Sequence, residues 1–388
     1  DARGSRVRIT IPERKIALDG GDVRLTSGRN VLRAPAIFYT HPAAQERTRL
    51  GNFLAEGAGS LDFVPNPGEP GEVLRAQWQQ SVRLTRDQGK PCLWLDGRPR
   101  LAMTGRGELV ADEMKIYLEE VAPGDGMALN GDADESTVRP DRLSAIGTVI
   151  IQSPQLTGRT HELSAWFRYH SPSAKQDGAD SESGNRDRFA LPNEQDGGEA
   201  YDIQADLVRL EMALRGRRAE PANLACDGNV VFREVRTKNP GEGPLVLHGQ
   251  RLTVENIDKS ARIAVLGAPE GAPATERNRA EMTARGVTLL GRAVYVDEGE
   301  NRAWIDGGGE AHLKLNRDLQ GQPTASAYPV KIRWRDGLNF DGRQIQLEGD
   351  VFAEGPDDWL RSDRMVATLT REIDFGKSVD RSRLDLAV

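Results

Sequence analysis

Cysteine, long apolar runs and helical patterns are scarce in this chain of 388 residues. The two cysteines, Cys92 and Cys226, are far apart and form no CxxC pair. Because both lie in apolar, strand-like surroundings, we favour two buried thiols over a single disulfide. No apolar run approaches the roughly 18 residues that a membrane-spanning helix needs. The chain begins at Asp1 without Met, and we expect that a targeting segment has been removed.

Signatures of catalysis and of cofactor binding are also missing from the sequence. The five histidines form no HExxH motif, and no two of them have the i, i+4 spacing of a metal site. There is no GxSxG motif and no phosphate-binding loop, since Gly307-Gly308-Gly309 lacks a following Lys. We therefore predict a non-enzymatic protein with no catalytic residue, no metal and no cofactor. Scattered carboxylate pairs leave a carbohydrate-binding or carbohydrate-cleaving β-solenoid as the enzymatic alternative.

Charge and composition exclude further classes of protein. The net charge is −7 and the pI about 5.5, so no overall positive field attracts nucleic acid. Hydrophobic residues make up 38% of the chain, and there are 41 glycines. This balance favours a body with a thin core and many turns over a large α/β enzyme with a thick core.

Apolar residues alternate with polar ones along much of the chain, which predicts β-strands. Tyr201 to Gly216 has the composition of a helix, but its apolar residues alternate as in a strand. A stretch rich in Ser, Asp, Gly, Asn and Glu spans 171–200 and predicts a loop or disordered insert. We therefore expect β-regions at 1–170 and 201–388, although a continuous sheet with a looped-out insert fits equally well.

One sequence unit recurs with an aliphatic residue, a small residue, Asp and then alternating apolar positions. Its three best copies are Leu109–Leu118, Ile203–Met212 and Leu360–Leu369. In the first copy, the apolar positions change parity between Ala111 and Met114, so one flat strand cannot keep both on one face. We predict a bend or bulge at the acid of each copy, which is Asp112, Asp206 or Asp363.

A second recurring unit starts with Gly, continues with a polar residue and ends in apolar alternation. It occurs at Gly147, Gly228 and Gly349, the last two reading GNVVF and GDVF. Gly followed by Asn or Asp suits a positive φ at a turn from which a strand leaves. The irregular spacing of both units predicts similar rungs of sheet separated by loops of different length.

The alternation of these two units resembles the OstA-like family of lipopolysaccharide-transport β-jellyrolls. The best local matches are Leu224–Val254, Phe340–Leu369 and Leu143–Tyr169. The resemblance implies an all-β, elongated, open twisted jellyroll, in which an antiparallel sheet folds over an apolar interior that holds acyl chains. It also implies that such units, one or two in this chain, stack edge to edge. The chain departs from the compact members in its length and its polar insertions.

The alternating apolar residues of the repeats are the candidate groove lining implied by the resemblance. They are Met114, Ile116, Leu118, Val208, Leu210, Met212, Leu252, Val254, Ile345 and Leu347. We expect a periplasmic or cell-envelope protein that binds lipopolysaccharide or another acylated glycolipid, and that adds strands edge to edge with itself or a related jellyroll. An ordinary filled core remains the alternative, and it predicts a purely structural envelope scaffold.

Overall fold

The fold is that of a computed structural model, which describes most of the chain. The described residues are 1–42, 51–64, 73–121, 127–128, 137–154, 156–170, 200–215, 218–236, 243–257, 259–269, 278–284, 286–317, 319, 322–369, 372 and 386–387. The expected insert at 171–200 lies outside these residues, apart from Ala200.

All regular elements in the described residues are β-strands, which confirms the all-β prediction. Every paired ladder is antiparallel, and the Tyr201 segment belongs to a strand rather than a helix. The chain divides into two compact units, Asp1–Arg168 and Tyr169–Val388, which we call unit 1 and unit 2.

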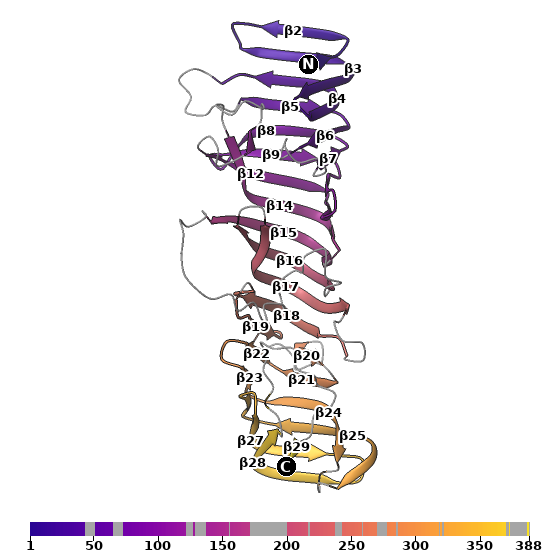
Figure 1. The fold of residues 1–388 in the computed structure, drawn as a ribbon, viewed down its shortest axis with the longest axis vertical. Helices are drawn as coiled ribbons and strands as arrows, with labels where there is room; N and C mark the ends of the chain where they lie inside the picture. The colour runs from indigo at the N-terminus through magenta and orange to yellow at the C-terminus, as the bar shows by residue number, and fades with distance from the viewer. Residues whose placement is uncertain are drawn as a thin grey trace, which may run out of the picture. The chain divides into compact units, whose positions relative to one another are not determined.

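Unit 1 contains the first fifteen strands, whose last member runs slightly beyond the division (Figure 1). They are β1 (Ala2–Arg3), β2 (Arg6–Thr10), β3 (Lys15–Ser27), β4 (Asn30–Thr40), β5 (Asn52–Glu56), β6 (Gly59–Phe63), β7 (Leu74–Trp78), β8 (Ser81–Asp87), β9 (Lys90–Asp96), β10 (Arg100–Met103), β11 (Gly107–Val110), β12 (Glu113–Val121), β13 (Met127–Ala128), β14 (Thr137–Gln152) and β15 (Leu156–His170).

Two ladders of short strands connect the long strands β4 and β14 of unit 1. Ladder A runs β4-β5-β8-β9-β12-β14, and ladder B runs β4-β6-β7-β10-β11-β14. Because β4 and β14 each take part in both ladders, the ten strands form a closed hydrogen-bonded ring. The predicted folded antiparallel sheet is therefore present, but the prediction that it is open is wrong in its hydrogen-bond topology.

Unit 2 contains the remaining strands. They are β16 (Ala200–Arg215), β17 (Arg218–Arg236), β18 (Val246–Glu255), β19 (Arg262–Leu266), β20 (Ala280–Ala284), β21 (Val287–Gly291), β22 (Ala293–Asp297), β23 (Arg302–Asp306), β24 (Gly309–Arg317), β25 (Pro323–Trp334), β26 (Gly337–Phe340), β27 (Gln344–Glu354), β28 (Trp359–Leu369) and β29 (Leu386–Ala387).

Unit 2 repeats the connectivity of unit 1 strand for strand. Its ladder A runs β18-β19-β22-β23-β26-β27, and its ladder B runs β18-β20-β21-β24-β25-β27. In both units the chain visits the ladders in the same order, A, B, B, A, A, B, B, A, between the two long strands. Each strand of one ring therefore has a counterpart in the other.

A corner separates the ladder A half from the ladder B half of each long strand. In β14 the pairing register shifts between Ile146 and Val149, where Gly147 has a φ of +100°. The carboxylate of Asp112, in the break between β11 and β12, accepts a hydrogen bond from the Thr148 amide at 3.0 Å. The bend predicted at Asp112 is thus present, opposite a bulge in the neighbouring strand.

Two further corners repeat this pairing of an acid with a glycine. A Cβ at Gly228 would collide with the Asp206 carboxylate, and one at Gly349 would collide with that of Asp336. Asp363 lies opposite the same bulge of β27, on β28, but Asp336 packs on the glycine. The expectation that these glycines begin strands is wrong, because β17 and β27 continue on both sides of each bulge.

Replacing Gly147 with Ala tests how strongly the corner depends on this close approach. The added Cβ meets the Asp112 carboxylate, and the φ of +100° disfavours any L side chain. We expect Gly147→Ala to lower the free energy of unfolding by about 3 kcal/mol or more in urea denaturation. Gly89→Ala is the control, because Gly89 has a φ of +79° and open space around it. Equal losses in the two variants would contradict the packing argument.

Candidate functional site

The apolar interior of unit 1 begins with a row of fully buried side chains beside the corner. We call it the core row of unit 1, and its members pair in register across eight strands. They are Leu18, Ile37, Ala55, Val82, Leu95, Met114, Ala145 and Leu163. None of them is more than 6% exposed. This row forms the packed core of ladder A.

A second row lies two residues further along the same strands and therefore faces the same interior. This rim row of unit 1 also pairs in register from strand to strand. It consists of Ile16, Tyr39, Phe53, Leu84, Leu93, Ile116, Leu143 and Ala165. Apart from Ala165, its members are half-buried or exposed. The interior of unit 1 thus presents a continuous apolar strip that its own side chains cover only in part.

An apolar cavity of about 200 Å³ opens on this strip near the N-terminus. Its lining residues belong to β3, β4 and β5. They are Ile16, Leu18, Leu25, Ile37, Tyr39 and Phe53. Leu25 lies on the half of β3 that pairs with β1, beyond the corner from the other β3 residues. The cavity therefore has an apolar wall from each half of the folded sheet.

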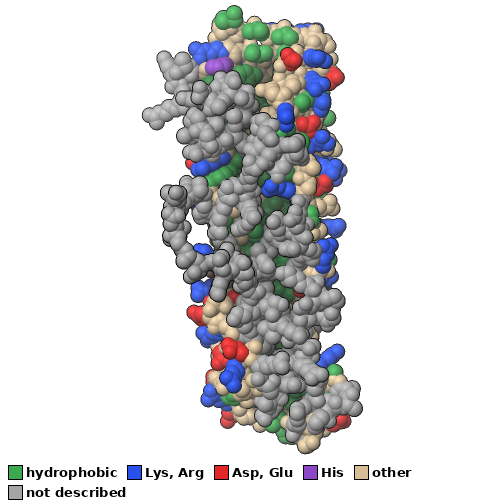
Figure 2. All heavy atoms as spheres, viewed as in Figure 1, with side chains coloured by type: hydrophobic (Ala, Val, Ile, Leu, Met, Phe, Trp, Pro, Cys, Tyr) green, Lys and Arg blue, Asp and Glu red, His purple; other side chains and the backbone are tan. Residues whose placement is uncertain are grey.

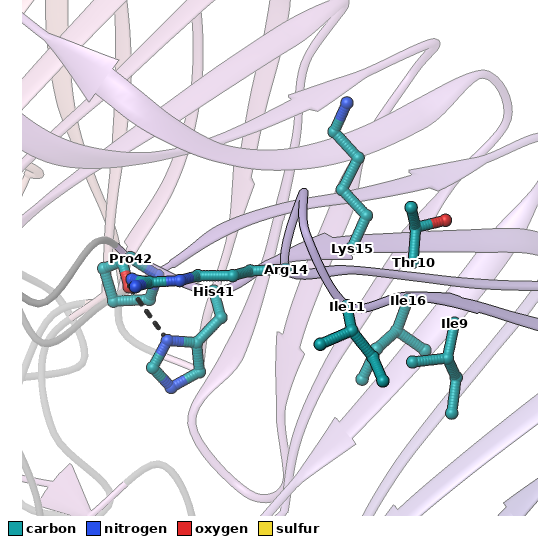
Figure 3. A pocket seen from close by; sticks show the side chains of 8 residues that line it. All are labelled: Ile9, Thr10, Ile11, Arg14, Lys15, Ile16, His41 and Pro42. Atoms are coloured by element: carbon teal, nitrogen blue, oxygen red, sulfur yellow. Dashed lines mark hydrogen bonds between the residues drawn. The ribbon is translucent and has the colours of Figure 1, made fainter.

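A larger and shallower depression of about 490 Å³ lies at the end of the strip. Ile9, Ile11 and Ile16 project to one side and form its apolar floor (Figure 3). At its rim the Arg14 guanidinium donates to the Pro42 carbonyl at 2.9 Å. Figure 2 shows apolar side chains gathered over this N-terminal part of unit 1. The apolar strip is thus accessible at the N-terminal edge.

Strand β2 forms this edge, and it pairs with β3 alone among the described strands. Its inward side chains, Val7 and Ile9, are 58% and 65% exposed. Arg6 and Arg8 alternate with them. An edge strand with exposed apolar side chains and a free backbone edge can accept a further strand.

The opposite face of ladder A is occupied by aromatic and cationic side chains. The Trp94 indole lies between the Arg83 guanidinium, 3.7 Å from the ring centroid, and the Lys115 ammonium at 4.1 Å. The Tyr117 hydroxyl donates to Asp87 at 2.8 Å, and this bond lowers the pKa of the Asp87 carboxyl. These contacts place charged and polar groups over the outer face at β8, β9 and β12.

The predicted groove residues are divided between unit 1 and unit 2. Met114 and Leu118 are buried in unit 1, while Ile116 is half-buried in its rim row. Of the unit 2 residues, four are buried and three half-buried. The buried ones are Val208, Leu252, Val254 and Leu347, and the half-buried ones are Leu210, Met212 and Ile345.

Most of the rim row of unit 1 is absent from the groove predicted from the sequence. Phe53, Leu84, Leu93 and Leu143 lie outside the copies of the repeat that suggested the groove. Alternation with Val82 and with Leu95 does mark Leu84 and Leu93 as inward-facing. Their alignment into one row depends on strand pairing, which no single segment contains.

No family model matches the chain, and no curated protein matches it. Within the described residues there is no group of His, Cys, Asp and Glu side chains that fits a metal ion. No helix in that part of the chain is long and apolar enough to cross a membrane.

The two cysteines are free and buried, one in each unit. Burial raises the pKa of the Cys92 thiol to about 11 and that of the Cys226 thiol to about 12. At pH 8 the reactive thiolate is therefore a negligible fraction of either group. Cys226 lies between Val208 and Leu252 in the interior of unit 2.

We expect both thiols to resist a thiol-specific reagent at pH 8 in the native protein and to react when urea unfolds the chain. The measurement is a colorimetric thiol titration with and without urea, with Cys92→Ser and Cys226→Ser variants assigning each site. Rapid reaction of either thiol in the folded protein would contradict its burial.

Proposed function

We propose that this protein is a non-enzymatic carrier that binds the acyl chains of a glycolipid in the interior of its folded sheet. One observation carries the proposal: the rim row of unit 1 forms a continuous apolar strip that remains half-exposed. Fully burying a Leu or Ile side chain is worth about 1.5–3 kcal/mol, so several partly exposed members leave a substantial gain for a ligand. The strip runs across neighbouring strands, so an extended acyl chain lying along it would cover one rim-row side chain of each strand.

Membership of the OstA-like lipopolysaccharide-transport family is part of the same proposal. Long strands that turn a corner around an apolar interior support it, as do the repeats that mark Asp112 and Asp206. The ligand we favour is lipopolysaccharide or another acylated glycolipid, and the place of action is the periplasm or cell envelope. The antiparallel pairing of every described ladder argues against the alternative of a parallel β-solenoid.

Lipid extraction from matched variants tests the carrier function. Ile116 belongs to the half-buried rim row, whereas Ile146 is 42% exposed and pairs with Glu113 and Glu162 on the outer face. We expect protein purified from its native envelope to contain acylated glycolipid by mass spectrometry of organic extracts. Ile116→Asp should lose at least about tenfold of it, because a carboxylate on the strip costs more than about 1.4 kcal/mol.

Ile146→Asp is the control, since it introduces the same charge on the same ladder without touching the interior. It should keep the lipid content of the wild type. A clean extract from folded wild-type protein would contradict the carrier function and favour a structural scaffold. If the folded Ile116→Asp variant contained as much lipid as the wild type, the rim row would not be the lipid-binding surface.

We also propose that the β2 edge adds to a strand of a second jellyroll, either another copy or a related domain. The free backbone edge and the exposed Val7 and Ile9 support this docking mode. The Val7→Lys substitution would place an unpaired charge in the interface between β2 and the added strand. We therefore expect it to weaken self-association about tenfold or more, measured as the concentration dependence of light scattering.

Val235→Lys provides the comparison, because Val235 is 62% exposed but belongs to β17 of unit 2 and not to the β2 edge strand. It should associate like the wild type. A strictly monomeric wild type at high concentration, alone and with added related domains, would refute the docking of β2.

A further inference from the structure

The matching connectivity of the two units allows their interiors to be compared position by position. In ladder A the rim-row residues Leu84 and Leu93 of unit 1 are half-buried. Their counterparts on β22 and β23 of unit 2 are Val296 and Ala303, which are 8% and 7% exposed. At these two strands the row is therefore partly open in unit 1 and closed in unit 2, although the side chains in unit 2 are smaller. Further along the row, Phe340 on β26 and Ile345 on β27 are half-buried, like their counterparts in unit 1.

Ladder B shows the same difference between the units. Leu32 on β4 is half-buried, whereas its counterpart Leu247 on β18 is 1% exposed. Ile151 on β14 is half-buried, whereas Ala353 on β27 is fully buried. At these positions ladder B is tighter in unit 2, as ladder A is at β22 and β23. The exception is Leu289 on β21, which is half-buried although its unit 1 counterpart Ala76 is buried.

Side chains from both ladders fill the interior of unit 2 at β24 to β28. Tyr328, Val330 and Ala353 form a buried cluster on ladder B, and Met365 packs against it. Met365 pairs with Leu347 in the ladder A half of β28, so the two walls of the interior touch here. Burying these groups against each other uses the apolar surface that a ligand would otherwise cover.

Hydrogen bonds to Asp358 connect the segments around this buried cluster. The Tyr328 hydroxyl donates a hydrogen bond to Asp358, in the turn between β27 and β28. The other carboxylate oxygen of Asp358 accepts the Leu319 amide at 3.2 Å. The acid therefore ties the β24–β25 loop to the β27–β28 turn on either side of the buried cluster.

We infer that the two units divide the work: unit 1 holds the apolar ligand, and unit 2 is filled by its own side chains and takes none. This inference rests on the proposed carrier function. Its consequence is that only one of the two units binds the ligand, whereas unit 2 has the same fold without a binding surface. The ligand it concerns is the acyl chain of an amphiphile, independent of the headgroup.

Photolabelling of the full-length protein tests the inference. The probe is a fatty acid that carries a diazirine in its chain, and the adducts are mapped by peptide mass spectrometry. We expect labels on the unit 1 strands that carry the rim row, such as β8, β9 and β12, at about tenfold or higher yield than on β18 to β28. Comparable labelling of β18 to β28 would overturn the inference and leave the carrier function standing. Absence of label anywhere on the folded protein would overturn both.

A pair of neighbouring substitutions on β28 tests the filling itself. Met365→Ala removes the side chain that joins the two walls and leaves an apolar void. We expect it to add labels on β25 and β27 without reducing those in unit 1. Val366→Ala changes the adjacent, 44% exposed residue and should keep the wild-type pattern. A folded Met365→Ala variant with unchanged labelling would show that side-chain filling does not exclude the probe.

Discussion

The corner between the two halves of each long strand is the constraint on which the rest of the structure depends. Because side chains alternate every residue, a flat strand would send Ala111 and Met114 to opposite faces, yet both are buried. The break between β11 and β12 at Asp112, which packs on the Gly147 bulge of β14, restores a common inward face. The same pairing recurs in unit 2, between Asp206 and Gly228 and between Asp336 and Gly349.

Depth within the interior follows from distance to that corner. Side chains next to the corner, such as Leu95 and Met114, are fully buried. Side chains that lie two positions further from the corner along the same strand, such as Leu93 and Ile116, are only half-buried in unit 1. A packed core and an accessible apolar strip can therefore coexist on one face of one ladder, which is what a carrier of acyl chains requires.

The two units show that one connectivity permits different interiors. Unit 2 has the same order of strands and two acid–glycine corners, and Met365 packs there on the Tyr328 cluster. Stability and binding make opposite demands on such an interior, since every apolar group buried internally is withdrawn from a ligand. A duplicated architecture allows one unit to meet the first demand and the other to meet the second.

The sequence by itself determined the strands and the corners, because both are local. Alternation marks the strands, and the parity change around Asp112 marks a bend, since each involves only residues that are neighbours in the chain. The sequence did not separate Asp336 from Asp363, because that depends on which strand lies across the bulge. The rim row, the closed ring and the difference between the units were decided only in the tertiary structure. Phe53 and Leu84, for instance, come together because pairing between distant segments sets their register.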